Sequence, residues 1–220
     1  IEAGSVDPSE IASLADRLAA FYNSQPACRA DGQLFLKHLS NEQAINRPIL
    51  LQPEFDLGPS TKDIAAATDR ALARAMPEIE ARVGFGRIVE GHGDLRPDPL
   101  QIIDCLEFNR SMRMLDPYDE VNYLGMECEI LGAAWIREHL MAGVTRHCGH
   151  PPSDNLLAAY GAFRALLRAR ISIVHLLEKP IRKPEKWRPL TLRYLNQARC
   201  ELVKSQGRAG RRSNRLREAG

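Results

Sequence analysis

Few cysteines, few aromatic residues and no long apolar run characterise this sequence of 220 residues. Its five cysteines are an odd number and contain no Cys-x-x-Cys pair, which excludes a disulfide framework and a zinc ribbon. No stretch approaches the roughly 18 apolar residues of a membrane span. Hydrophobic residues make up 44% and charged residues 26%, so collagen-like and wholly disordered classes are excluded as well.

A large charge of either sign is also lacking. Thirty Lys and Arg against 28 Asp and Glu leave a formal net charge of +2, so we expect no chain-wide attraction to nucleic acid or to a membrane. The unpaired cysteines fit a reducing compartment, and we expect a cytoplasmic protein. The chain begins at Ile1 without an initiator Met and without a basic-then-apolar leader, so we expect a further segment upstream.

Most of the chain has helical periodicity. Asp7-Pro8-Ser9-Glu10 combines an N-cap acid, an early proline and a capping-box glutamate, and predicts a helix over 8–23. Apolar spacing predicts five more helices. Their ranges are 31–45, ended by the loop that Pro48 opens; 60–83, with Pro77 starting a short continuation; 117–140, breaking near Gly149; 155–177; and 185–203.

Glycines and β-branched residues interrupt this pattern between 84 and 104. Two short strands, near 87–89 and at 100–103, are the natural interpretation, with a loop between them. We therefore expect a mainly α fold of the α+β kind, with strand confined to these pieces. The last 14 residues, 207–220, hold five arginines and almost no apolar residue, which predicts a disordered tail.

The loop 90–99 carries the chemistry. Phosphoryl transfer needs one carboxylate to accept the proton of the acceptor hydroxyl and another to hold Mg²⁺. Asp94 lies in the loop and Asp104 ends the second expected strand, so a hairpin-like return brings both to one mouth, with roughly 5–9 Å between the carboxylates. A glycine-rich hairpin without function is the plain alternative.

His92-Gly93-Asp94-Leu95 resembles the catalytic-loop string of the aminoglycoside phosphotransferase family, whose fold is similar to that of protein kinases. Residues 104–109 and 115–124 are similar to a bacterial branch that is often joined to a C-terminal P-loop domain. The resemblance covers about residues 8–205. It implies that residues 1–206 form the large helical lobe of a kinase-like fold, with a short catalytic β-hairpin and without the N-terminal small lobe.

The resemblance also implies roles. Asp94 would be the catalytic base, Asp104 would bind Mg²⁺ beside ATP or another nucleoside triphosphate, His92 would brace the loop, and Asp116 would support it from the next helix start. Glu107 and Asn109 belong to the branch's string, where core packing and substrate contact are equally plausible. For a polycationic sugar acceptor, the candidate lining acids would be Glu107, Asp119, Glu120 and Glu127.

Three positions depart from the family pattern. Pro99 stands where the family has an Asn that binds the second metal ion, and Asp98 is our hypothetical substitute, because carboxylates bind hard cations well. Arg96, at the family's usual basic position, either clamps a phosphate oxygen or pairs with Glu90. The sequence contains no G-x-G-x-x-G, no Walker A string and no Val-Ala-Ile-Lys-like strand, so we expect the isolated chain to be inactive.

Three functions remain open on the sequence alone. The first is the large lobe of an ATP- and Mg²⁺-dependent phosphotransferase for a small-molecule hydroxyl acceptor. The second is a degenerate kinase-like binding or regulatory module without catalysis. The third is a helical interaction domain with an arginine-rich arm for nucleic acid, which we consider unlikely because no aromatic residues alternate with these arginines.

Overall fold

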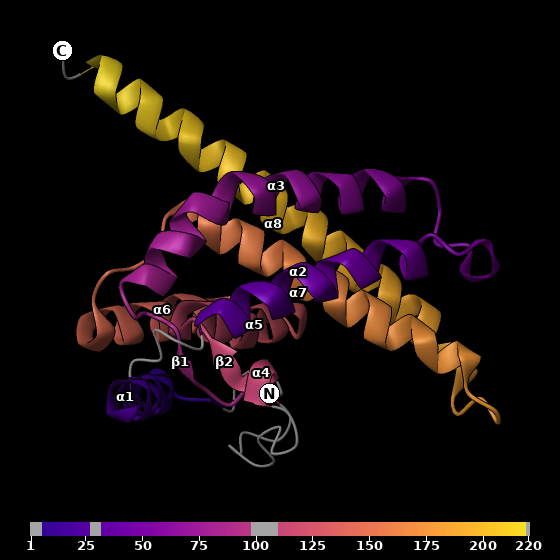
Figure 1. Cartoon of the computed structure of the whole chain (residues 1–220), viewed down its shortest axis with the longest axis horizontal. Coiled ribbons are helices and arrows are strands. Elements are labelled where there is room, and N and C mark those ends of the chain that lie inside the picture. The colour runs from indigo at the N-terminus through magenta and orange to yellow at the C-terminus, as the bar shows by residue number, and fades with distance from the viewer. Residues whose placement is uncertain (1–5, 27–31, 98–109, 219–220) are drawn as a thin grey trace. The chain divides into compact units, whose positions relative to one another are not determined.

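The computed structural model describes residues 6–26, 32–97 and 110–218, with side chains described up to residue 204 and not at residue 111. This part of the chain is mainly helical, as Figure 1 shows. It divides into two compact units. The first unit comprises residues 1–40 and 77–152, and the second comprises 41–76 and 153–220. The single lobe expected over 1–206 stays a prediction.

Two helices, α2 (Gly32–Leu50) and α3 (Ser60–Gly84), contribute to both units. The predicted end of α2 is wrong, because the helix runs five residues beyond 45, whereas the predicted range 60–83 matches α3 within one residue. Pro48 lies inside α2 and Pro77 lies inside α3, where we expected a loop and a new start. A proline removes one backbone hydrogen bond. Near the end of α2 this loss affects only the last turn, and α3 runs on for seven residues beyond Pro77.

The first unit contains α1 (Pro8–Ser24), which begins with the predicted capping box at Asp7. It packs against α6 (Trp135–Cys148), and α6 packs against α5 (Pro117–Ile130). The helix predicted over 117–140 is therefore two helices. They separate at Gly132, whose φ of +90° lies in the left-handed region that glycine favours. The buried side chains of this unit include Ile11, Leu18, Tyr118, Ile136 and Leu140.

A two-stranded antiparallel sheet also lies in the first unit. Strand β1 (Val89–Glu90) pairs with β2 (Met114–Leu115), which follows the single-turn helix α4 (Arg110–Arg113). The predicted first strand is thus displaced by one or two residues. The predicted second strand, 100–103, lies outside the described residues, and the described partner of β1 is β2. The two apolar residues Met114 and Leu115 give too short a pattern for sequence periodicity to detect β2.

The second unit is built around α7 (Asp154–Val174) and α8 (Pro184–Glu218), which lie side by side (Figure 1). Two 3₁₀ helices, η1 (Pro53–Phe55) and η2 (His175–Leu177), complete it. Helix α7 confirms the prediction for 155–177, and its buried face includes Leu156, Tyr160, Phe163, Leu166 and Ile173. Helix α8 continues through the arginine-rich segment from 207 that we expected to be disordered, and that disorder stays a prediction.

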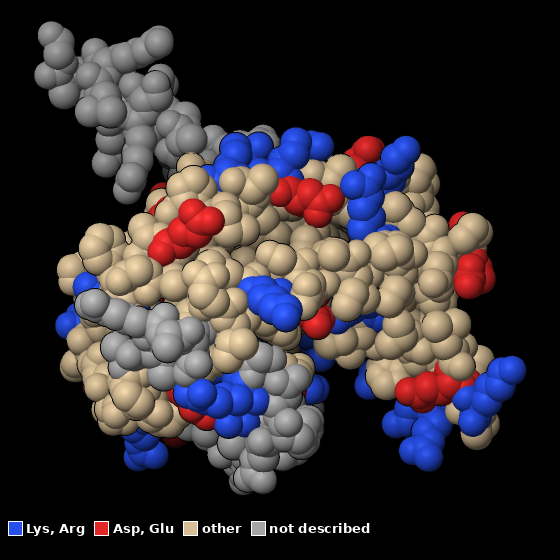
Figure 2. All heavy atoms as spheres, in the orientation of Figure 1, with Lys and Arg blue, Asp and Glu red and all other residues tan. Residues whose placement is uncertain are grey.

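Among the described residues, no helix combines the length and apolar character needed to cross a membrane. Basic and acidic side chains are intermixed over much of the face seen in Figure 2.

Candidate functional site

The loop after β1 leaves the sheet at Gly91, whose N–H donates to the carbonyl of Arg113 at 2.8 Å. Glycine is needed here because of a close approach. A Cβ on residue 91 would lie 2.7 Å from Oε2 of Glu120 and 2.7 Å from Cδ1 of Leu115. The missing side chain therefore lets the Glu120 carboxylate reach the backbone of the loop.

Glu120 holds the loop. Its carboxylate accepts hydrogen bonds from the backbone N–H of His92 at 3.2 Å, the backbone N–H of Gly93, and the hydroxyl of Tyr22 at 2.8 Å. Glu120 lies on α5 and is 1% exposed, so its charge has left water and depends on these donors. Burial, followed by the charge of Glu120, raises the pKa of Tyr22 well above its ordinary value. The phenol therefore stays protonated and keeps donating.

His92 connects the loop to Asp94. Its ring is buried, and Nδ1 accepts a hydrogen bond from the backbone N–H of Asp94 at 3.3 Å. An accepting Nδ1 places the proton of a neutral ring on Nε2, which has no hydrogen-bond partner among the described residues. The contact is of the kind that a loop-bracing role requires.

The side chain of Asp94 reaches solvent, with 29% of it exposed. Both carboxylate oxygens accept from Nε of Arg96 at 3.0 Å, and Nη2 of Arg96 also bonds to Oδ2. The hydroxyl of Tyr123 lies 3.4 Å from Oδ1. Of the two roles expected for Arg96, pairing with Glu90 is thus replaced by pairing with Asp94.

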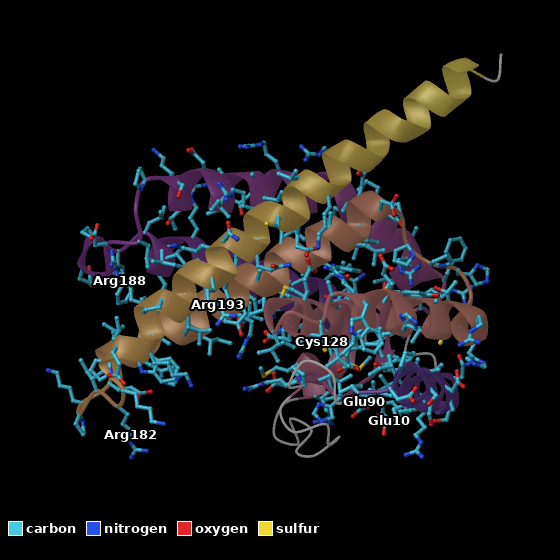
Figure 3. All side chains as sticks on the ribbon, turned by 180° about the vertical axis from the view of Figure 1, so that it is seen from behind. Glu10, Glu90, Cys128, Arg182, Arg188 and Arg193 are labelled. Carbon is cyan, nitrogen blue, oxygen red and sulfur yellow. The ribbon has the colours of Figure 1, made fainter. Side chains whose placement is uncertain are left out.

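Glu90 has other partners. Nη2 and Nε of Arg113 lie 2.7 and 2.9 Å from its Oε1, and Nε of Arg110 lies 3.5 Å from Oε2. The hydrogen bonds from Arg113 are the main cause of the lowered pKa of Glu90. These pairs connect β1 to α4 and β2 beside the loop. Glu90 is labelled in Figure 3.

Asp116 lies at the start of α5, and its described hydrogen bonds do not go to the loop. Its Oδ1 accepts from the N–H of Tyr118 at 3.0 Å, which makes it the N-cap, and from Nη2 of Arg82 at 2.9 Å. Burial raises the pKa of Asp116, and the Arg82 guanidinium opposes that effect. Because α5 carries Glu120, the support that we expected from Asp116 reaches the loop through Glu120.

Four other predicted site residues have no described position. Asp98, Asp104, Glu107 and Asn109 lie outside the described residues, so the expected distance between the carboxylates of Asp94 and Asp104 stays a prediction. Within the described ranges, no group of three or more His, Cys, Asp or Glu side chains is arranged to hold a metal ion.

Sequence reasoning misplaced the role of the acids on α5. Asp119, Glu120 and Glu127 were candidates to line a cleft for a cationic sugar, but all three are buried. Glu120 instead holds the loop. The sequence does carry a signal: Glu120 lies four residues after the N-cap Asp116, one helical turn into α5. Only the fold, however, brings that position to Tyr22 and His92.

A cavity of about 150 Å³ lies in the same unit, lined by residues that include Tyr22, Arg82, Arg87, Tyr118 and Cys148. Asp94 and Arg96 do not belong to its lining. Burial raises the pKa of Cys148, so its thiol is not an activated nucleophile. The cavity therefore adds no reactive group to the loop chemistry.

Three curated proteins are similar to part of the chain. They are uncharacterized proteins of Mycobacterium bovis and of two strains of Mycobacterium tuberculosis, each 34% identical over 100 residues. The match includes 42% of this chain and 20% of each relative, so the chain matches about a fifth of the length of these relatives. No protein-family model and no solved structure matches the chain.

Proposed function

We propose that the chain is the large helical lobe of a kinase-like phosphotransferase that moves a phosphoryl group from ATP to a hydroxyl group of a small molecule, in the cytoplasm. The observation that carries this proposal is the construction of the loop 91–96. Two backbone N–H groups are fixed by the buried Glu120, and a third is fixed by His92. The buried carboxylate of Glu120 holds the backbone of the loop in place. Asp94 is the carboxylate within 91–96 that reaches solvent.

Asp94 is suited to the work of a general base. A catalytic base must be held in place, and it must reach the proton that it accepts. The backbone of Asp94 is held by the ring of His92, and its side chain reaches solvent. In the proposed reaction, a carboxylate oxygen of Asp94 accepts the proton of the acceptor hydroxyl. The hydroxyl oxygen attacks the γ-phosphorus of ATP, and the bond from that phosphorus to the bridging oxygen breaks, which releases ADP.

Arg96 supplies the positive charge beside this base. Its side chain is 47% exposed, and a guanidinium can bind a phosphate oxygen and a carboxylate with different N–H groups. In this proposal Arg96 orients Asp94 and binds the phosphoryl group that moves. Mg²⁺, when bound, would neutralise phosphate charge. The oxygen ligands to hold it would be Asp104 and Asp98, a donor set that suits a hard cation.

The test compares substitutions in the longest natural protein that carries this sequence and in the 220-residue chain itself. Asp94→Asn should lower the rate of transfer or of ATP hydrolysis by roughly 10²–10⁴-fold and leave Mg²⁺-ATP affinity nearly unchanged. Asp104→Asn should abolish that affinity. Asp56→Asn is the control, because Asp56 is an exposed carboxylate in the other unit. Equal rates for Asp94→Asn and its parent protein would refute the role of Asp94.

A second candidate is favoured by the ion pair between Asp94 and Arg96. A carboxylate whose two oxygens both accept from a guanidinium is less available as a base, which is compatible with a kinase-like binding module that lacks catalysis. Such a module would bind nucleotide without turnover in every form tested. Asp98→Ala separates the two candidates, because a loss of metal affinity as large as that of Asp104→Asn would show that Asp98 replaces the family's amide ligand.

A further inference from the structure

The turn between α7 and α8, residues 175–188, concentrates charge that the whole chain does not have. Five Lys and Arg residues and two Glu residues leave this turn with a net charge of +3, compared with +2 for all 220 residues. Lys179, Arg182, Lys183 and Lys186 are exposed. Figure 2 shows basic side chains around the turn, at the lower right of the view, and Arg182 lies at its outer end in Figure 3.

Three of these five cations are not neutralised by neighbouring acids. Lys179, Arg182 and Lys183 have no side-chain ion pair or hydrogen bond within the part of the chain that the structure describes. Lys186 lies over the ring of Trp187, 4.9 Å from its centroid, and Arg188 pairs with Asp56 at 3.0 Å. Of the two glutamates, Glu178 is bonded to Nδ1 of His175 at 2.6 Å.

The turn is ordered by an aromatic stack. The rings of His175 and Trp187 lie 3.9 Å apart with an angle of 22° between their planes, and Nε1 of Trp187 donates to the carbonyl of Arg182 at 2.6 Å. The two ends of the turn are thereby joined. The cations of the turn therefore lie on a loop whose two ends are held together.

Two aliphatic side chains stand among the cations. Leu177 is 54% exposed and Ile181 is 44% exposed. Exposed aliphatic groups next to Lys and Arg are typical of segments that lie at a bilayer surface, where the apolar groups enter the headgroup region and the cations bind anionic lipids. Trp187 adds an indole ring, which is favoured at the same depth.

We propose that the α7–α8 turn, residues 175–188, is a docking site for the surface of an anionic lipid bilayer. The expectation that the chain has no membrane partner rested on the missing apolar span and on the small net charge, and neither describes a local surface. Nucleic acid explains the turn less well. The phosphate backbone would use the cations, but Leu177 and Ile181 would gain nothing, and the Trp187 ring is already covered by His175 and Lys186.

The test is sedimentation of the full chain with vesicles, either of phosphatidylcholine alone or with about a third of phosphatidylserine. The chain should bind the anionic vesicles, and salt should weaken the binding. Each cation near an anionic surface contributes roughly a fivefold increase in affinity. Replacing Lys179, Arg182 and Lys183 together with Gln should therefore weaken binding roughly 100-fold.

A matched control removes the same charge elsewhere. Lys62→Gln, Arg70→Gln and Arg74→Gln change three exposed cations on α3 and should leave vesicle binding close to that of the parent chain. A second variant, Leu177→Ser with Ile181→Ser, keeps every charge and should weaken vesicle binding several-fold. In a Trp135→Phe background, the emission of Trp187 should shift to shorter wavelength on anionic vesicles.

Three results would overturn the proposal. The first is equal binding to both kinds of vesicle. The second is equal weakening by the turn and the control triple variants, which would show that only total charge matters. The third is unchanged vesicle binding in the serine variant together with tight binding of duplex DNA that requires Lys179, Arg182 and Lys183. That result would identify nucleic acid as the partner of the turn.

Discussion

Replacing Glu120 with alanine removes an acceptor that three donors share. The hydroxyl of Tyr22 and the N–H groups of His92 and Gly93 all donate to this carboxylate, and Glu120 is 1% exposed. The truncation leaves the donors without their acceptor in a buried place. Each buried donor that loses its partner costs about 1–3 kcal/mol, and water entering the space left by the side chain recovers part of that.

We expect Glu120→Ala to lower the free energy of unfolding by about 4 kcal/mol and Glu120→Gln to lower it by about 2 kcal/mol. The glutamine keeps one carbonyl oxygen as an acceptor but turns an amide N–H₂ toward the other donors. Tyr22→Phe removes one donor and leaves the Glu120 carboxylate with its two backbone N–H donors, so its cost should be near 1 kcal/mol. The double variant Tyr22→Phe, Glu120→Ala should cost less than the sum of the two single variants, because the residues are in contact.

The assay combines denaturant unfolding with amide hydrogen exchange of the loop. In the parent chain the N–H groups of His92 and Gly93 should be protected, and in Glu120→Ala their protection should fall by more than the global loss of stability predicts. A loss below 1 kcal/mol for Glu120→Ala, with unchanged protection of these two groups, would show that the carboxylate does not hold the loop.

Three further predictions concern the same unit. Gly91→Ala should cost about 2 kcal/mol in a thermal or denaturant melt, because its Cβ would lie 2.7 Å from the carboxylate that holds the loop, whereas Gly84→Ala meets no atom within 4 Å and should not destabilise the chain. Burial raises the pKa of Cys128 to about 11, so the thiol ionises first in the unfolded chain. Cys128 should therefore lower stability by about 2.5 kcal/mol as the pH rises from about 9 to 11, and Cys128→Ala should reduce the fall of the unfolding midpoint by that share. Arg82→Ala should cost about 3–5 kcal/mol in the same melt, because it leaves Asp116 buried without its cation. Asp116→Asn should cost less, because a neutral amide still caps α5. Equal costs for the two variants would contradict the ion-pair argument.

The features that the sequence predicts well are local. The capping box at Asp7 places the start of α1, and the dense apolar periodicity of α7 places nearly all of it. The features that it predicts poorly depend on distant contacts. Nothing within a few residues of Met114–Leu115 marks these two residues as a strand, because a two-residue strand is defined by its partner, Val89–Glu90. The prolines at 48 and 77 show that a proline inside a helix only adds a free-energy cost. Favourable tertiary packing can outweigh that cost.

The candidate site divides in the same way. The sequence identifies His92, Asp94 and Arg96 as chemically informative because they are crowded between glycines. It cannot show that Arg96 pairs with Asp94, since either carboxylate within reach would serve. Nor can it show that Glu120 holds the loop, because that depends on the position of α5 beside α1 and the sheet.

The contacts of Glu120 also bear on the order in which the molecule acquires its shape. Tyr22 and Glu120 are 98 residues apart in the chain, and His92 and Glu120 are 28 apart. Contacts between residues so far apart form only after long segments of chain have closed into loops, which slows them relative to helix formation. During synthesis, α1 and the loop are made before α5, which carries the acceptor Glu120. The geometry around Asp94 is therefore acquired late, and a growing chain that stops short of α5 should not contain it.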